Sequence, residues 1–495
     1  MTYNELIEFC NPVSVEGTPP ERMGSLCQDS RSVSNGDIFI AIKGTQTDGH
    51  NYIDSAIEQG ASVIISEKEP LVDHPAAQIR VNDTRSLFSP LAQKLAGDPA
   101  KELLIVGVTG TNGKTTVATL VWQTLRNLGQ GAALLGTISK KINDEVMPSR
   151  LTTADPIELA ADMKKMVDAG CKYMVMEVSS HALHQKRVEG LTFEVAAFTN
   201  LSHDHLDYHE TMEEYAAAKK HLFDGLPVTG WAVTNADDAY GSYMVKDTKA
   251  KVLDFSFKGN AIINGRVEES TAAGSLIGVE GVKVKTPLLG YFNAVNVLEA
   301  MVICTALGFD GKTVASVLGD CRGAEGRMER VSINGNHGKH PVVIVDYAHT
   351  PDALDNVAST LTNLKTDKQK LIIVFGCGGD RDRNKRSAMA KIAETHADEV
   401  IVTSDNPRSE DPAAIIEEIT EGFSKTFTYR AITSRKEAIH VAISEADADS
   451  IILIAGKGHE TYQEINGIRK HFDDREEAST ALAWRKGHAK NCEVN

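Results

Sequence analysis

The feature that most constrains the fold of this 495-residue chain is the stretch V-G-V-T-G-T-N-G-K-T-T, from Val106 to Thr116. Four apolar residues, Leu103 to Val106, lead into it like a buried parallel strand, and an amphipathic helix is expected from Val117 to Leu128, closed by Gly129. A strand, a tight glycine loop and a helix N-terminus, in that order, form a site for an anion. The pattern therefore predicts a parallel α/β sheet with a phosphate-binding loop at its edge.

The residues of this loop have distinct predicted tasks. Gly110 and Gly113 let the backbone bend and approach a phosphate closely. Lys114 would reach the β- and γ-phosphates, and the Thr115 hydroxyl would bind Mg²⁺. The usual G-x-x-x-x-G-K-[ST] pattern has a glycine where this chain has Val108, so the loop is a variant P-loop. A glycine turn with a solvated lysine is the alternative, but the flanking strand and helix favour the phosphate site.

Composition and charge narrow the class of protein. Hydrophobic residues make up 42% of the chain, and the length predicts about three domains. The formal net charge of −16 argues against a nucleic-acid partner, although a local basic cleft could hold an anionic substrate. No apolar run approaches the roughly 20 residues of a membrane span. With no signal peptide recognisable at the start, we expect a cytoplasmic protein without membrane insertion. The seven cysteines are scattered without C-x-x-C spacing, which argues against a disulfide framework and a zinc site.

Polar residues follow two further predicted strands. The strand Tyr173–Val178 places Glu177 at its end, where a buried carboxylate needs a cation or hydrogen-bond donors. Glu177 is therefore a candidate Mg²⁺ ligand, with a salt bridge or a cap as the alternative. The strand Val195–Thr199 leads into N-L-S-H-D-H-L-D-Y-H, which lacks the spacing of a zinc site. We expect His205 to bind Mg²⁺ and the other histidines to order the loop.

Two helices in this region begin with clear capping signals. Asp155 is a predicted N-cap followed by Pro156, and Thr211 with Glu214 forms a predicted capping box. The second helix carries Lys219 and its neighbour Lys220. Taken alone, both lysines are expected to be solvated, because a free ammonium would be repelled by Mg²⁺.

The two ends of the chain read as further α/β regions. Up to about residue 100 short strands and helices alternate, and Asp29 to Arg31 either meets a nucleotide or forms a polar turn. From Pro341 onward, strands that end in charged or glycine-rich loops alternate with helices, as in a doubly wound domain. A dinucleotide fingerprint beginning at Gly376 fails because Arg381 stands at its last position, which argues against NAD.

Together the motifs resemble those of the Mur ligase family. V-T-G-T-N-G-K-T-T, M-E-V-S-S-H, T-N-L-S-H-D-H-L-D-Y-H, F-N-A-V-N, G-R-M-E, D-Y-A-H-T-P-D, G-C-G-G-D-R-D, D-N-P-R-S-E-D-P and A-G-K-G-H-E follow the family order between residues 29 and 475. The resemblance implies a three-domain α/β fold. A small N-terminal UDP-binding α/β domain (1–100) would precede a central P-loop, parallel-sheet ATPase domain (101–330) and a C-terminal Rossmann-like, amino-acid-binding domain (331–495).

The resemblance also implies a function. It points to an ATP-dependent amide ligase that adds meso-2,6-diaminopimelate to UDP-N-acetylmuramoyl-L-alanyl-D-glutamate through an acyl phosphate, in cytoplasmic peptidoglycan precursor synthesis. The cofactors would be ATP and Mg²⁺, and the protein would be a monomer. The alternatives are the same ligation with L-lysine, a folylpolyglutamate synthase, and a P-loop nucleotide switch. The N-K-x-D motif with which a GTPase reads its base does not occur.

Residue roles are carried over from the family onto matching positions. For the UDP substrate they are Ser30, Thr45, Gln46, Thr47, Thr152, Thr153, Ser179, Gln185 and Arg187. For ATP they are Gly110, Thr111, Asn112, Gly113, Lys114, Thr115, Thr116, Asn293, Arg327, Asp346 and His349. For the amino acid they are Arg381, Asp405, Asn406, Pro407, Arg408, Gly456 and Glu460. The catalytic set is Lys114, Glu177, His205 and Lys219, and the metal ligands are Thr115, Glu177, His205 and Lys219.

At two of these positions, the resemblance changes what the residues alone would suggest. Lys219 falls on the family's N-carboxylated lysine, and a carbamate offers the oxygen ligands that Mg²⁺ prefers. Arg408, in D-N-P-R, suits the second carboxylate that diaminopimelate has and lysine lacks, since its planar fork binds a carboxylate with two hydrogen bonds. The alternative for Arg408 is a bridge to Glu410 or Asp411.

Overall fold

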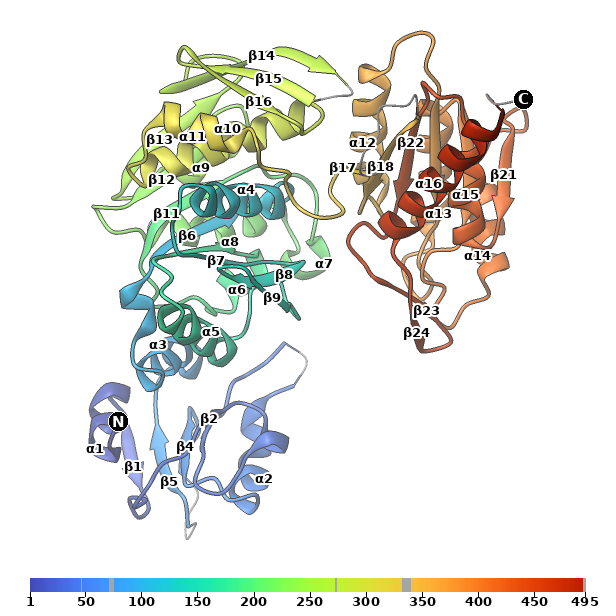
Figure 1. Ribbon diagram of the computed structural model, residues 1–495. Coiled ribbons are helices and arrows are strands. Elements are labelled where there is room, and N and C mark those ends of the chain that lie inside the picture. Colours follow the sequence, from blue (N-terminus) through green and yellow to red (C-terminus); the bar gives the residue numbers. More distant parts are fainter. Residues whose placement is uncertain (46, 71–74, 272–273, 332–339, 493–495) are drawn as a thin grey trace. The chain divides into compact units, whose positions relative to one another are not determined.

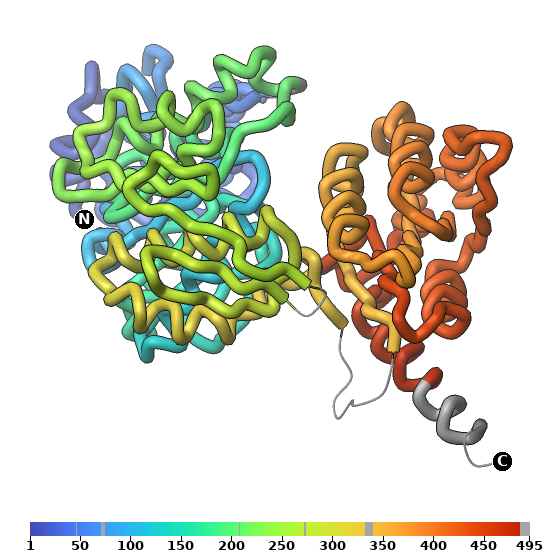
Figure 2. The backbone as a smooth tube through the Cα atoms, turned by 90° about the horizontal axis from the view of Figure 1, so that it is seen from above, coloured from blue at the N-terminus to red at the C-terminus, as the bar shows by residue number. Residues whose placement is uncertain are grey.

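The computed structural model describes the whole chain except residues 46, 71–74, 272–273, 332–339 and 493–495. It divides into two compact units, residues 1–264 with 299–314, and residues 265–298 with 315–495. Helices and strands alternate in both units (Figure 1), which confirms the predicted α/β class. Figure 2 shows the course of the backbone from the N-terminus in blue to the C-terminus in red. The boundaries expected near residues 100 and 330 stay a prediction.

The N-terminal part of the first unit is built on a small sheet. Its elements are α1 (Tyr3–Cys10), β1 (Ser14–Glu16), β2 (Leu26–Cys27), η1 (Ser30–Ser32), β3 (Ile38–Ile40), η2 (Gly49–Tyr52), α2 (Ile53–Glu58), β4 (Val63–Ser66), β5 (Ala77–Arg80), α3 (Thr84–Leu95) and η3 (Pro99–Glu102). The strand order is β1-β5-β4-β3-β2, with only β1 running antiparallel to its neighbour. Apolar side chains of β3 and β4 alternate between the two faces, because successive residues of a strand point to opposite sides.

The rest of the first unit surrounds the glycine loop. Its elements are β6 (Leu104–Thr109), α4 (Lys114–Asn127), β7 (Ala132–Leu135), β8 (Ser139–Ile142), β9 (Glu145–Pro148), α5 (Pro156–Asp168), β10 (Tyr173–Glu177), α6 (Ser180–His184), β11 (Phe193–Phe198), α7 (Leu206–His209), α8 (Met212–Asp224), β12 (Trp231–Asn235), α9 (Gly241–Met244) and β13 (Lys251–Ser256). The order is β13-β12-β11-β6-β10-β7-β8-β9, and β6 pairs in parallel with both β10 and β11. The carboxyl ends of these three strands therefore meet at one edge.

Both predicted helix starts are confirmed. Asp155 caps α5 by accepting hydrogen bonds from the amides of Ile157 and Glu158 at 3.0 Å each. Thr211 caps α8 by accepting from the amide of Glu214 at 3.2 Å, but its own amide donates to the His209 carbonyl at 2.7 Å, so the predicted capping box is only half formed. Such short-range bonds leave few helical amides unsatisfied and fix where the helix begins.

The second unit contains a doubly wound sheet, as predicted from Pro341 onward. The strands of this unit are β15 (Gly274–Val279), β16 (Val282–Thr286), β17 (Glu329–Val331), β18 (Val342–Asp346), β19 (Leu371–Phe375), β20 (Glu399–Thr403), β21 (Tyr429–Ile432), β22 (Ile451–Ala455), β23 (Tyr462–Ile465) and β24 (Ile468–His471). Its helices are α12 (Pro351–Leu364), α13 (Asn384–His396), α14 (Pro412–Thr420), α15 (Arg435–Glu445) and α16 (Asp474–Cys492). Residues of both units occur in β14 (Ile263–Thr271), α10 (Tyr291–Ala306) and α11 (Gly311–Leu318).

Helices cover both faces of this sheet, whose order is β17-β18-β22-β19-β20-β21. Alternate residues of the strands, such as Ile373 and Ile372, pack against α12–α14 on one face and against α15 and α16 on the other. Burial on both faces explains why the strands are continuously apolar in the sequence. Among the described residues, no helix combines the length and apolar character needed to cross a membrane.

Helix α10 contains a buried carboxyl group that lacks a hydrogen-bond partner among the described residues. Glu299 is 0% exposed, and both of its carboxylate oxygens are unbonded. Burial raises the pKa of this carboxyl well above its ordinary value. Because the folded pKa lies above the unfolded one, Glu299 should lower stability progressively as pH rises above the unfolded pKa of about 4.3.

We expect Glu299→Met to raise the free energy of unfolding by about 1–3 kcal/mol, since it removes a buried polar group without emptying its volume. The gain should be larger at pH 8 than at pH 5. As pH rises between these values, the carboxyl keeps its proton more fully in the folded state than in the unfolded state, so the wild-type protein loses stability. Thermal unfolding of both proteins at the two pH values measures it. A Glu299→Met protein less stable than wild type at pH 8 would contradict the expectation.

Candidate active site

The glycine loop between β6 and α4 is shaped as a cradle for an anion. Gly110 has a φ of +149°, and a Cβ there would lie 1.9 Å from the Thr199 hydroxyl. Gly113 has a φ of +89° and immediately precedes α4. The Nζ atom of Lys114 donates to the carbonyl oxygens of Gly110 at 2.9 Å and Thr111 at 2.8 Å. The first amides of α4 and this ammonium are thus gathered at one point, which suits phosphate oxygens.

Glu177 lies at the same sheet edge, at the end of β10, and is 1% exposed. Its carboxylate accepts from the Thr115 hydroxyl at 2.8 Å and from the Thr137 amide at 2.7 Å and hydroxyl at 3.1 Å. A Cβ on Gly136 would lie 2.4 Å from this carboxylate, so a larger residue there would displace it. These partners bond the carboxylate without neutralising it, and a hydroxyl beside a carboxylate is an oxygen donor set that fits Mg²⁺.

Lys219 of α8 is buried beside the loop, so the expectation that it is solvated is wrong. It is 1% exposed, its Nζ donates to the Gly110 carbonyl at 2.9 Å, and it lies 4.5 Å from the centre of the Tyr215 ring. Burial, and then the nearby charge of Lys114, lower the pKa of Lys219 well below its ordinary value. Lys220 is also buried, where it pairs with Asp224 and Asp247.

His205 is more exposed than this buried set, although its ring lies 5.9 Å from that of Tyr215. Its backbone has a φ of +55°, its side chain is 44% exposed, and its ring lies 5.0 Å from that of His181. His209 is buried, contacts the Ser180 hydroxyl at 2.9 Å, and has its pKa lowered to about 4 by burial and neighbouring histidines. Within the described ranges, no group of three or more His, Cys, Asp and Glu side chains is arranged to hold a metal ion. The structure thus brings Thr115 and Glu177 together, and the role of His205 as a metal ligand stays a prediction.

Most of the residues predicted to hold the UDP substrate form one connected group. The Thr153 hydroxyl accepts from the Ser179 amide at 3.0 Å, and the Thr153 carbonyl accepts from Arg187 at 2.9 Å. Arg187 also donates to the Gln185 side chain at 2.7 Å, and the Thr152 hydroxyl lies 3.1 Å from that of Thr137. Burial lowers the pKa of Arg187.

The other predicted UDP residues belong to the N-terminal sheet region. Ser30 is buried in η1, while Thr45 and Thr47 are exposed in the loop between β3 and η2. Gln46 lies outside the described residues.

The second unit contains the remaining residues predicted to meet ATP. Asp346, at the end of β18, accepts from the amides of Met328 and Ala348 at 2.7 Å each, and burial raises its pKa. The Arg327 guanidinium lies 4.8 Å from the centre of the Tyr347 ring. His349 contacts the Tyr347 carbonyl at 2.9 Å, and burial lowers its pKa. Asn293 of α10 is buried and donates to the Leu289 carbonyl at 2.9 Å.

Arg408 is held firmly in the pocket expected to receive the amino acid. Its backbone is left-handed, with a φ of +51°, and its amide donates to the Glu464 carbonyl at 3.1 Å. The Asn466 amide donates to the Arg408 carbonyl at 2.6 Å, and the guanidinium donates to the Gly379 carbonyl at 2.7 Å. A left-handed non-glycine residue is uncommon and is kept only where its surroundings fix it.

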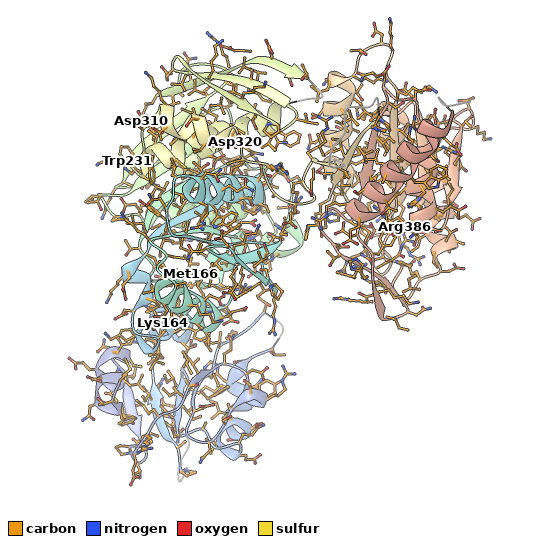
Figure 3. All side chains as sticks on the ribbon, in the orientation of Figure 1. Lys164, Met166, Trp231, Asp310, Asp320 and Arg386 are labelled. Carbon is orange, nitrogen blue, oxygen red and sulfur yellow. The ribbon has the colours of Figure 1, made fainter. Side chains whose placement is uncertain are left out.

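The alternative partners of Arg408 are engaged elsewhere. Glu410 pairs with Arg383 at 2.8 Å and with Arg386 at 2.8 Å. Arg386 is a side chain of α13 with only 1% exposure (Figure 3). Asp411 caps α14 by accepting from the Ala413 amide at 2.9 Å. Both carboxylates thus have other partners, and a ligand-binding role for Arg408 stays a prediction.

The rest of the predicted amino-acid set surrounds this position. Asp405, Asn406 and Pro407 are buried at the end of β20, and Gly456, with a φ of +121°, follows β22. A Cβ on Gly456 would lie 2.5 Å from the Asp405 carboxylate. Arg381 is exposed and contacts the Asp380 carbonyl at 3.5 Å.

Sequence reasoning missed several participants. Thr137 bonds both Glu177 and Thr152, yet its only signal was a position just after a strand. Lys457 was part of the quoted A-G-K-G-H-E motif but received no role. Its complete burial is visible only in the structure.

Comparisons with known proteins give the same family over nearly the whole chain. Three models match successive segments: "Mur ligase family, catalytic domain" at residues 24–94, "Mur ligase middle domain" at 108–304, and "Mur ligase, glutamate ligase domain" at 326–458. The corresponding expectation of a three-domain α/β fold is confirmed.

Individual relatives agree. A protein of Phocaeicola vulgatus named UDP-N-acetylmuramoyl-L-alanyl-D-glutamate–2,6-diaminopimelate ligase is 44% identical over 480 residues, 96% of this chain and 98% of its own length. A Bacillus licheniformis protein of the same name is 42% identical, with 97% and 99% covered.

Solved structures extend the likeness to three dimensions. One described as the same ligase has a TM-score of 0.72 at 36% identity and covers 97% of this chain and 99% of its own. A MurF ligase from Thermotoga maritima, solved with ADP, shares the fold with a TM-score of 0.58 at 17% identity over 94% of this chain and 98% of its own. With domain models along its length and relatives above 40% identity from end to end, this chain belongs to the Mur ligase family.

Proposed function

We propose that this chain is the ATP-dependent ligase that joins meso-2,6-diaminopimelate to UDP-N-acetylmuramoyl-L-alanyl-D-glutamate. One observation supports the proposal most strongly: Lys114, Thr115 and the buried Glu177 lie together at one edge of the sheet. This arrangement suits a nucleoside triphosphate with its metal ion. The names of the full-length relatives supply the substrates.

The geometry fits a two-step ligation. Lys114 and the first amides of α4 would hold the β- and γ-phosphates while a substrate carboxylate oxygen attacks the γ-phosphorus and ADP leaves. The amine of the amino acid then attacks the carbonyl carbon of the acyl phosphate, and phosphate and a proton are released. Mg²⁺, held by Thr115 and Glu177, would offset negative charge on the phosphate oxygens. His205 is proposed as a further metal ligand, and no residue is assigned as a general base.

Lys219 is proposed to carry a carbamate. Its lowered pKa favours the neutral amine, whose nitrogen can bond to the carbon of CO₂ and then lose one proton. The product is an anion with two oxygens beside Gly110 and Lys114. It would add oxygen ligands for Mg²⁺ where the unmodified side chain offers none.

The connected group around Thr153 and Arg187 is proposed to hold the UDP-linked substrate, with Ser30, Thr45, Gln46 and Thr47 at its nucleotide end. Asn293, Arg327, Asp346 and His349 are proposed to complete the binding of ATP. The pocket formed by Arg381, Asp405 to Arg408, Gly456 and Glu460 is proposed to receive the amino acid.

Arg408→Ala should raise the KM for diaminopimelate by about 10–100-fold and shrink its advantage over lysine. The guanidinium is partly buried, and lysine would leave it without a carboxylate partner, so selectivity also comes from that unpaired charge. Steady-state kinetics with both amino acids measure the change. Arg430→Ala, which removes an exposed arginine paired with Glu445 at 2.6 Å in the same unit, is the control. Equal use of both amino acids by the unmutated enzyme would rule the assignment out.

Phosphate release tests the function as a whole. The unmodified protein should release phosphate from ATP only when both a UDP-muramoyl dipeptide and an amino acid are present. Turnover with lysine but not diaminopimelate would favour the lysine-adding alternative, and turnover with a folate and glutamate would favour a folylpolyglutamate synthase. Hydrolysis that needs neither substrate would indicate a nucleotide switch.

A further inference from the structure

A fully buried lysine contacts two of the residues proposed to bind the amino acid. Lys457, in the loop after β22, is 0% exposed. Its Nζ donates to the Asn406 side-chain oxygen at 3.1 Å and to Glu460 Oε2 at 3.0 Å. A lysine is almost never fully buried unless it is paired, because removing an ammonium from water is costly. Its position therefore needs a reason beyond packing.

The first partner, Glu460, is oriented by two donors that bind the same oxygen. Oε2 accepts from Lys457 and also from the Asn406 amide nitrogen at 2.8 Å. Two bonds to one oxygen hold Oε2 in place, while Oε1 takes no part in these two bonds. The Glu460 side chain is 18% exposed, whereas that of Lys457 is 0% exposed, so of the two partners only the carboxylate reaches solvent.

The second partner, Asn406, connects the lysine to Arg408. Its side-chain oxygen accepts from the Glu464 amide at 2.9 Å as well as from Lys457. Glu464 lies in β23, and its carbonyl accepts from the Arg408 amide at 3.1 Å. One continuous series of hydrogen bonds thus runs from Lys457 through Asn406 and Glu464 to Arg408. The same ammonium is thus bonded to the Glu460 carboxylate and connected to the backbone of Arg408.

The backbone that carries Lys457 is itself fixed on both sides. A Cβ on Gly456 would meet the Asp405 carboxylate at 2.5 Å, and a Cβ on Gly458 would meet the Gly326 carbonyl at 2.7 Å. The preceding carbonyl, of Ala455, accepts from Arg435 at 3.0 Å. These contacts restrict the backbone on both sides of Lys457 and so hold its side chain in one position.

We propose that Lys457 is a positioning residue for the amino-acid substrate, holding Glu460 for an ammonium group and Arg408 for a carboxylate group. This inference rests on the proposed function, which places Glu460 and Arg408 on the amino acid. Lys457 acts through these residues and does not touch the substrate. Its loss should weaken amino-acid binding selectively and leave the ATP and UDP sites intact.

The test is the kinetics of Lys457→Met, which keeps the length of the side chain and removes its charge. The KM for diaminopimelate should rise about tenfold or more, because Glu460 loses a charged donor and Asn406 one of its partners. The KM values for ATP and the UDP substrate should stay within about twofold, since those sites lack the lysine. Lys365→Met, which removes a lysine paired with Asp398 in the same unit, is the matched control and should change none of the three.

A double-mutant cycle with Glu460→Gln separates positioning from general weakening of the fold. If Lys457 acts through Glu460, Lys457→Met should raise the KM for diaminopimelate less in the Glu460→Gln background than in the wild type, and the remaining rise is its effect through Asn406 and Arg408. Independent, multiplying effects would overturn the proposal, as would an unchanged KM in Lys457→Met or an equal rise in the KM for ATP.

Two further readouts keep the outcome unambiguous. If Lys457→Met does not fold, Lys457→Gln retains a donor within the same motif and should give an intermediate KM; a wild-type KM in that variant would overturn the proposal. If the unmutated enzyme uses no diaminopimelate, the proposed function fails first. The variants are then compared with whichever amino acid it does use, and an unchanged KM there overturns the role of Lys457.

Discussion

Lys114→Ala should abolish ligation while leaving the fold intact. The ammonium lies in the glycine loop, where it donates to the Gly110 and Thr111 carbonyls beside the first turn of α4. Groups that stabilise a transferring phosphoryl group account for about 10³-fold or more in rate. We therefore expect kcat at saturating ATP to fall by at least about 10³-fold. Phosphate release under saturating substrates measures it.

Lys164→Ala is the control for this experiment. Lys164 lies on α5 of the same unit, 52% exposed and paired with Asp168 (Figure 3). Its removal should leave kcat unchanged. Circular dichroism and thermal unfolding of Lys114→Ala should match those of wild type, because the side chain is at the surface of the loop rather than in a core cluster. A Lys114→Ala enzyme that ligates within a fewfold of the wild-type rate would contradict the role of Lys114 in binding phosphate.

Lys219→Ala should be nearly inactive and partly rescued by small carboxylates. If Lys219 carries a carbamate, the truncated side chain leaves a buried space beside Gly110 that formate or acetate can occupy with an equivalent anionic group. The rescue should saturate with carboxylate concentration, and we expect it to recover a minor part of an activity reduced by about 10²-fold or more. Rates measured across a series of carboxylates, with chloride at equal ionic strength, give the result.

The neighbouring lysine provides the comparison. Lys220→Ala removes a lysine that pairs with Asp224 and Asp247 on the other side of α8. It should cost some stability but keep most of the activity, and carboxylates should not change its rate. An active enzyme whose Lys219 is unmodified, in crystals grown with bicarbonate and Mg²⁺, would refute the carbamate.

Patterns that act over a few residues were sufficient to predict much of this protein. The strand, glycine loop and helix around Gly110 follow from the apolar run, the glycines and the helix periodicity, and Asp155 and Thr211 cap the helices they were predicted to cap. The alternating strands and helices after Pro341 gave the doubly wound sheet for the same reason. Local hydrogen bonds and the hydrophobic period decide such features, and both can be read along the chain. Family motifs added the substrates, which no local pattern encodes.

Contacts between distant residues were decided only by the tertiary structure. Thr115 and Glu177 are 62 residues apart, and Lys219 lies 109 residues from the carbonyl to which it donates. From its own neighbourhood Lys219 reads as a solvated lysine, and Lys457, 51 residues from Asn406, shows no sign of complete burial. A side chain's exposure and partners depend on which strands pair and in what register. Lys219 is buried beside the phosphate loop, whereas its neighbour Lys220 is buried beside two aspartates. The order of two successive lysines in a sequence does not reveal this difference.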